Sequence, residues 1–99
     1  MIIVAGYIEI DPEDRETFLL SRQDNIARSR LEDGCIDYTF SADSSDPSRV
    51  RVFEVWESAQ KLDVHLDNRP LGQKEEPAMT PRSRALYRYE VGSSGPLRS

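Results

Sequence analysis

The spacing of apolar and polar residues along the chain predicts four β-strands. The first runs from Ile2 to Ile10 and is apolar and largely β-branched apart from Tyr7 and Glu9. A strand that is apolar on both faces usually lies in the middle of a sheet, with a covering layer on each side.

Residues 35–42, 49–57 and 82–91 alternate with period two and predict the other three strands. One face of the second strand is expected to carry Ile36, Tyr38 and Phe40. One face of the third strand is expected to carry Val50, Val52, Glu54 and Trp56. Residues 43–48 are rich in Asp and Ser and contain a Pro, so the second and third strands are predicted to form a hairpin.

Helix signals occupy the intervals between the strands. One helix is predicted to begin at Asp11, whose carboxylate can cap free N–H groups, and to end at Gly34. Its apolar stripe comprises Phe18, Leu19, Ile26, Ala27 and Leu31.

A second helix over residues 59–67 follows a Ser58 cap. That helix presents Leu62, His65 and Leu66 on one face. A short, irregular third helix is expected over residues 71–79.

This order predicts an α+β, ferredoxin-like fold: a four-stranded antiparallel sheet with helices on one face. Residues 1–91 form the domain, and residues 92–99 form a flexible tail. Because the helices cover one face only, the other would expose Phe53, Val55 and several branched aliphatic side chains to water. A second copy of the sheet is the simplest cover, so a homodimer is expected.

Charge and composition narrow the classes of function. The net charge of −5 argues against nucleic-acid binding, because phosphates attract a basic surface. Cys35 is the single cysteine, which fits a reducing compartment, and no secretion signal or apolar run of about 20 residues is present, so we expect a cytoplasmic protein without membrane contact. Cys35 and the single histidine, His65, match no metal-ligand spacing, so no metal site is expected.

Three short segments carry a further signal: Gly34-Cys35 followed by Tyr38, the run Val52-Phe-Glu-Val-Trp-Glu-Ser, and Leu62-x-x-His65-Leu66. From about residue 2 to residue 91, this pattern resembles the antibiotic biosynthesis monooxygenase family. The resemblance implies a dimeric α+β barrel with a pocket between helices and sheet in each subunit. It also implies oxidation of electron-rich phenols or quinols by molecular oxygen, with no metal or flavin cofactor.

The same family contains heme-degrading enzymes, which provide a test. That branch uses an asparagine on the first strand, a tryptophan on the second helix and a histidine iron ligand further along. The matching positions here hold Tyr7, His65 and Glu75. Because a glutamate is a poor replacement for a neutral imidazole as an axial iron ligand, heme degradation is not expected.

Within this resemblance, His65 is the candidate catalytic residue, because an imidazole can accept a phenolic proton near neutral pH. The alternative is that it packs the second helix against the sheet. The candidate pocket residues are Trp56, Tyr7, Tyr38 and Asn25, each of which has a structural alternative. Glu54 needs a partner if its face is buried, and Arg84 or Arg88 on the last strand is predicted to form an ion pair with it.

The predicted function is a cofactor-independent monooxygenase that acts on a small aromatic phenol or quinol. Two alternatives stay open. The first is a non-catalytic dimeric module that binds a small hydrophobic metabolite or acts in a stress response, and a pocket without a titratable group would favour it. The second is an isomerase or decarboxylase of the same superfamily, and turnover without oxygen would favour it.

Overall fold

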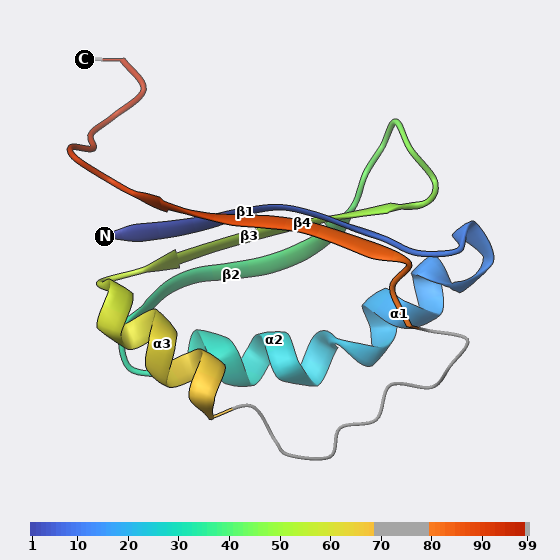
Figure 1. The fold of residues 1–99 in the computed structure, drawn as a ribbon, viewed down its shortest axis with the longest axis horizontal. Helices are drawn as coiled ribbons and strands as arrows, with labels where there is room; N and C mark the ends of the chain where they lie inside the picture. Colours follow the sequence, from blue (N-terminus) through green and yellow to red (C-terminus); the bar gives the residue numbers. More distant parts are fainter. Residues whose placement is uncertain (69–79, 99) are drawn as a thin grey trace.

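The helices all lie on one face of a four-stranded sheet (Figure 1). The computed structural model describes residues 1–68 and 80–98. The strands are β1 (Ile2–Glu9), β2 (Cys35–Ala42), β3 (Arg49–Trp56) and β4 (Ser83–Glu90). The helices are α1 (Arg15–Ser21), α2 (Gln23–Arg30) and α3 (Ala59–Asp67), and a 3-10 turn (Pro12–Asp14) precedes α1. All paired strands are antiparallel, in the order β2-β3-β1-β4, so the predicted α+β, ferredoxin-like fold is confirmed.

The core lies between the sheet and the helices, on what we call the inner face of the sheet. The predicted face of β3 is buried along its whole length, and Trp56 at its end is fully buried. The first core cluster comprises Ile2, Val4, Tyr38, Trp56 and Leu62. The second core cluster comprises Ile8, Ile10, Phe18, Val50 and Val52. Phe40 packs against both clusters and joins them.

The single helix predicted between the first two strands is two helices that meet at Arg22. The Arg22 N–H already bonds back to Leu19 with a three-residue spacing, which is the tighter turn found at helix ends. The apolar stripe predicted for a single helix does not continue as one buried face across this break. Ala27 is exposed and Leu31 is 87% exposed, so the prediction that both belong to the buried stripe is wrong.

Both ends of that helical segment also differ from expectation. The Asp11 carboxylate makes no capping hydrogen bond; its backbone carbonyl accepts from the Asp14 N–H, and the carboxylate pairs with Arg82. Gly34 does adopt a left-handed conformation, with φ of +86°, but α2 ends earlier, at Arg30. A short turn therefore separates the helix from β2.

A bulge at the start of β2 changes which side chains face the core. Cys35 pairs with Trp56 and Asp37 with Val55, so Ile36 is an extra residue in the ladder. Ile36 is 54% exposed, and the prediction that it shares a face with Tyr38 is wrong.

Helix α3 begins as predicted. The Ser58 hydroxyl accepts a hydrogen bond from the Lys61 N–H at 3.2 Å. Leu62 and His65 are buried against the sheet, whereas Leu66 lies at the edge of the same face and is 36% exposed. The helix predicted over residues 71–79 lies outside the described residues.

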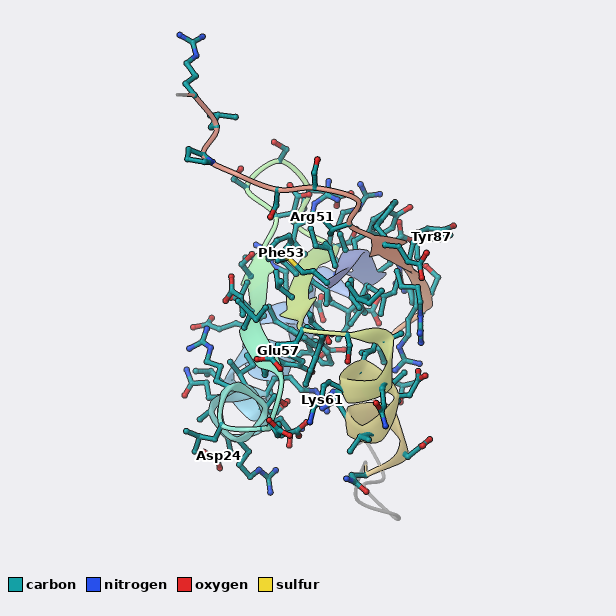
Figure 2. The ribbon with its side chains drawn as sticks, turned by 90° about the vertical axis from the view of Figure 1, so that its left-hand side faces the viewer. Asp24, Arg51, Phe53, Glu57, Lys61 and Tyr87 are labelled. Atoms are coloured by element: carbon teal, nitrogen blue, oxygen red, sulfur yellow. The ribbon has the colours of Figure 1, made fainter. Side chains whose placement is uncertain are left out.

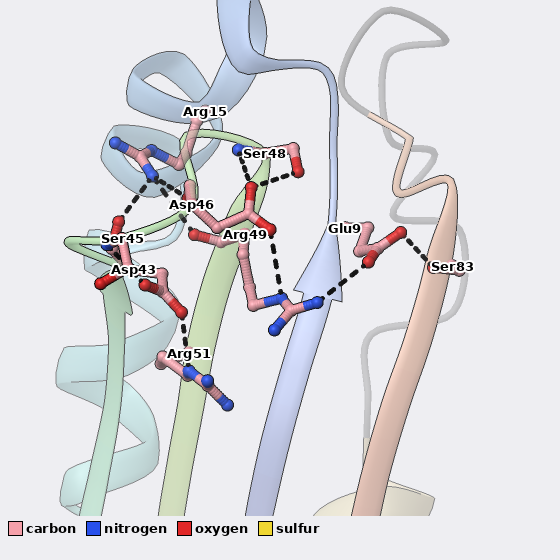
Figure 3. Close-up of polar contacts among 9 residues, drawn as sticks. All are labelled: Glu9, Arg15, Asp43, Ser45, Asp46, Ser48, Arg49, Arg51 and Ser83. Carbon is pink, nitrogen blue, oxygen red and sulfur yellow. Dashed lines mark hydrogen bonds and ion pairs between the residues drawn. The ribbon is translucent and has the colours of Figure 1, made fainter.

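The loop between β2 and β3 is tied to α1 by one arginine (Figure 3). The Arg15 guanidinium donates to the backbone carbonyls of Asp43 and Asp46, at 3.1 and 2.8 Å. Hydrogen bonds from Ser48 to its carboxylate hold the pKa of Asp46 below its usual value. The Ser45 backbone N–H does the same for the pKa of Asp43. Both carboxylates are therefore charged at neutral pH and stabilise the loop.

The outer face of the sheet, which points away from the helices, carries uncovered apolar groups. Phe53 on β3 is 38% exposed, and Tyr87 and Tyr89 on β4 are 62% and 54% exposed. Figure 2 shows Phe53 and Tyr87 on the side of the sheet opposite the helices. Within the described residues, no helix is long and apolar enough to cross a membrane.

Gly6 allows β4 to approach the central strand. Its φ is +150°, and a Cβ at this position would overlap the backbone carbonyl of Ala85 on β4. We expect Gly6→Ala to lower the free energy of unfolding by about 3 kcal/mol and the melting temperature by more than about 10 °C. Thermal denaturation followed by circular dichroism measures the change. Gly92→Ala is the matched control, because the added methyl meets no atom within 4 Å; equal melting of both variants would contradict the prediction.

Candidate functional site

A cavity of about 770 Å³ lies between the helices and the inner face of the sheet. Helix α2 forms one wall with Asn25, Ile26, Arg28 and Ser29. The remaining apolar lining comes from Ile8, Phe18, Phe40 and Leu86. This volume lies within the range typical of small-molecule sites, and the lining combines these apolar side chains with polar and charged ones.

His65 enters the cavity wall from α3 and is held in a defined orientation. Its Nδ1 lies 2.8 Å from Oε2 of Glu32, which lies just beyond the end of α2. A carboxylate can only accept a hydrogen bond, so Nδ1 carries the proton that points to Glu32, and in the neutral form of the ring Nε2 holds the lone pair. The side chain is 10% exposed, so it is shielded from bulk water while still lining the cavity.

Two aromatic rings support the imidazole. The Trp56 ring centroid lies 4.8 Å from that of His65, and the Tyr38 centroid lies 5.5 Å away. Trp56 is fully buried and packs behind His65. A residue that stacks on a substrate would have to face the cavity, and Trp56 does not line it. Its indole Nε1 donates to Glu54 Oε1 at 2.9 Å, which fixes the ring in the sheet.

The structure separates the other predicted pocket residues. Tyr38 and Asn25 line the cavity, and the Asn25 side-chain oxygen accepts a hydrogen bond from Arg28. Tyr7 lies on the outer face of the sheet, where the Arg49 guanidinium stacks at 3.8 Å from its ring centroid. Tyr7 therefore cannot reach a ligand in this cavity.

Glu54 was predicted to form an ion pair with Arg84 or Arg88, and the structure shows where these three residues lie. Glu54 is 7% exposed and lines the cavity, as does Arg84. Arg88 donates to Asp63 on α3 at 3.1 Å and thereby ties β4 to that helix. The pairing of Glu54 with an arginine stays a prediction.

Sequence reasoning missed Glu32, Arg22 and Arg28, which also line the cavity. Glu32 lies 33 residues before His65 and sits in a turn whose sequence is typical of a solvent-exposed segment. Knowledge of the fold could have identified it, because in this fold the turn before β2 runs beside the helix that follows β3, which is α3.

Among residues 1–68 and 80–98, no group of three or more His, Cys, Asp or Glu side chains is arranged to hold a metal ion. Glu75, which was compared with a heme ligand, lies outside these residues.

Cys35 packs against the first core cluster close to the carboxylates of the site. Burial raises the pKa of its thiol, and the negative charges of Glu32, Glu54 and Asp37 raise it further. The thiol is therefore kept neutral, which argues against a nucleophilic role.

The chain matches the family model described as antibiotic biosynthesis monooxygenase over residues 1–73. An uncharacterized Synechocystis protein, sll1783, is 41% identical over 64 residues, which are 65% of this chain but only 44% of that relative. YcnE of Bacillus subtilis, named as a candidate monooxygenase, is 29% identical over 65 residues, covering 66% of this chain and 68% of YcnE.

Solved structures share the fold at low identity. A protein from Deinococcus radiodurans bearing the same family name superposes with a TM-score of 0.72 at 20% identity, and all of each chain is covered. The heme-degrader MhuD from Mycobacterium tuberculosis superposes with a TM-score of 0.74 at 15% identity, covering 97% of this chain and all of MhuD. Identities this low establish the shared fold and not a shared reaction.

The raised pKa of the Cys35 thiol gives a pH dependence with a definite sign. The rate of alkylation by iodoacetamide should rise with pH. In the folded chain this rise should occur at higher pH than in the urea-unfolded chain, whose thiol pKa is about 8.5. The unfolded state then gains a thiolate first, so stability falls as pH rises through the unfolded thiol pKa. Coincident curves in the folded and unfolded chain would contradict the assignment.

Proposed function

Because the chain belongs to the antibiotic biosynthesis monooxygenase family, we propose that it oxidises an aromatic phenol or quinol with molecular oxygen inside the cavity. The observation that carries the proposal is the His65–Glu32 contact at the wall of a cavity that Phe18, Tyr38 and Phe40 also line. It provides one oriented base where a planar substrate would bind.

The reaction needs no electrons beyond those of the substrate. For a phenol, one O₂ is consumed and a para-quinone and one water are formed. Nε2 of His65 takes the hydroxyl proton, and the phenolate passes one electron to O₂. The phenoxyl radical and superoxide then join at the para carbon. The O–O bond of the resulting peroxide then breaks: the para hydrogen leaves on the outer oxygen as hydroxide, and the inner oxygen becomes the second quinone carbonyl. The hydroxide takes up the proton held by His65 and forms water.

Glu32 is the positioning residue in this scheme. Its carboxylate holds the Nδ1 proton and faces the positive charge that forms when Nε2 is protonated. The role we propose for Tyr38, whose ring lies edge-on to His65 and lines the cavity, is to donate a hydrogen bond from its hydroxyl to a substrate oxygen. Phe18 and Phe40 supply apolar walls that keep water from the intermediate.

The same proposal includes a homodimer formed through the outer face of the sheet. Phe53, Tyr87 and Tyr89 are too exposed for a face of this kind to remain uncovered in water. A two-fold pairing would bury these side chains and leave each helix-side cavity free for substrate.

The catalytic assignment is tested by oxygen uptake with 1-naphthol, whose para carbon carries a hydrogen, corrected for spontaneous oxidation. We expect His65→Ala to lower kcat by about 100-fold, because general-base catalysis contributes at least that factor. Glu32→Gln should lower kcat by about tenfold with little change in KM, as expected from loss of one charge-assisted hydrogen bond of roughly 1.5 kcal/mol.

Asp33→Asn is the matched control for Glu32→Gln. It removes an adjacent carboxylate that is 83% exposed and that pairs with Lys61, whereas His65 pairs with Glu32. Unchanged turnover in the His65 variant would remove its role as base. Binding of the phenol without oxygen uptake in the unmodified chain would favour a binding module, and turnover under nitrogen would favour an isomerase or decarboxylase.

The dimer is tested by sedimentation velocity at micromolar concentration. We expect the unmodified chain to sediment as a dimer and Phe53→Asp to sediment as a monomer, because a buried unpaired carboxylate is costly. Leu20→Asp is the control: Leu20 is 57% exposed on α1, on the helix side of the sheet, and its substitution should leave the dimer intact. A monomeric unmodified chain would refute the pairing.

A further inference from the structure

The charges around the cavity differ in sign from those of the protein as a whole. The chain has a net charge of −5. The described lining of the cavity nevertheless contains three arginines, Arg22, Arg28 and Arg84, against two glutamates. The cavity is therefore a locally positive region of an acidic protein, which favours an anionic ligand.

Strand register separates His65 from one of these arginines. Arg84 on β4 lies opposite Ile8 of β1, whereas Glu54 on β3 lies opposite Val4. His65 packs against Trp56, which lies opposite Ile2, and against Tyr38, which pairs with Glu54 at the Val4 position. Four residues of a strand span about 13 Å, so Arg84 and His65 lie toward opposite ends of the cavity.

Arg22 is separated from His65 by the length of helix α2, so it lies toward the same end of the cavity as Arg84. Arg22 precedes α2, and its guanidinium lies 4.9 Å from the centroid of the Phe18 ring in the second core cluster. Glu32, the partner of His65, lies beyond the opposite end of α2. We call Arg22 and Arg84 the arginine end of the cavity, and His65 and Glu32 the histidine end.

We propose that the ligand is an elongated aromatic acid, with its hydroxyl at the histidine end and a carboxylate at the arginine end. The position of the hydroxyl rests on the proposed function, whereas the carboxylate contact rests on the arginines alone. Guanidinium groups hold carboxylates through paired N–H donors. Each guanidinium has five such donors, so an arginine that already makes one contact retains donors for a ligand.

Arg28 lies between the two ends and contributes charge without defining either. It is exposed on α2, and its guanidinium donates to the neutral Asn25 side chain. Its position on the cavity wall fits a role in attracting an anionic ligand toward the arginine end.

Three ligands distinguish the effect of the carboxylate charge on binding affinity from the effect of the distance between carboxylate and hydroxyl. They are 6-hydroxy-2-naphthoate, with hydroxyl and carboxylate at opposite ends; its neutral amide, 6-hydroxy-2-naphthamide; and 3-hydroxy-2-naphthoate, with both groups on adjacent carbons. Calorimetric titration of the full chain without oxygen measures binding alone. The first ligand should bind at least about tenfold more tightly than the other two, and its advantage should shrink with added salt.

Variants assign the effect to the arginine end. Arg84→Gln and Arg22→Gln should each weaken binding of 6-hydroxy-2-naphthoate by about tenfold and leave the amide unchanged. Arg84→Lys should recover part of the loss, because charge returns without the paired donors. Arg98→Gln is the control, because it removes the same charge from the exposed tail.

Equal affinity for the acid and its amide in the unmodified chain would overturn the proposal, and this comparison holds even if an arginine variant fails to fold. An effect of Arg98→Gln equal to that of Arg84→Gln would also overturn it. Preference for the carboxylate without oxygen uptake would refute the oxygenase function and support the carboxylate contact at the arginine end. Oxygen uptake without preference for the carboxylate would support the oxygenase function and refute the carboxylate contact.

Discussion

The structure depends on the position of β1 between β3 and β4. Hydrogen bonds along both of its edges leave its side chains only two directions, so alternate residues define the two faces of the sheet. Val4 and Ile8 point inward and support the core, whereas Ile3 and Ala5 share the outer face with Phe53 and Tyr87. A cavity on one face and an uncovered apolar surface on the other are therefore consequences of the same strand.

The fold could be predicted from sequence wherever a pattern is local. The alternation of Val50, Val52, Glu54 and Trp56 marked the buried face of β3, and the Ser58 cap marked the start of α3. The failures arose where one residue changes the register. The bulge at Ile36 and the break at Arg22 each change the direction in which neighbouring side chains point, and neither position carries a residue type that signals an irregularity.

The candidate site was harder to predict because its residues meet through tertiary contacts. His65 could be selected as the only histidine, but Glu32 comes from a distant turn and pairs with it only when α2 and α3 are packed on the same sheet face. Tyr7 fails for a simpler reason. It falls at an odd position of β1, and in a strand of period two that parity sends the ring to the outer face, where it stacks on Arg49.

Helix α2 links the irregularities of the fold to the chemistry of the site. Because the preceding helix stops at Arg22, that arginine is brought to one end of the cavity, and because α2 ends before Gly34, the turn that carries Glu32 reaches His65 at the other. The distance between the two polar ends is then fixed by the length of one helix and by four residues of β-strand register. Both are rigid, so the cavity should select ligands by the separation of their polar groups more strongly than by their apolar bulk.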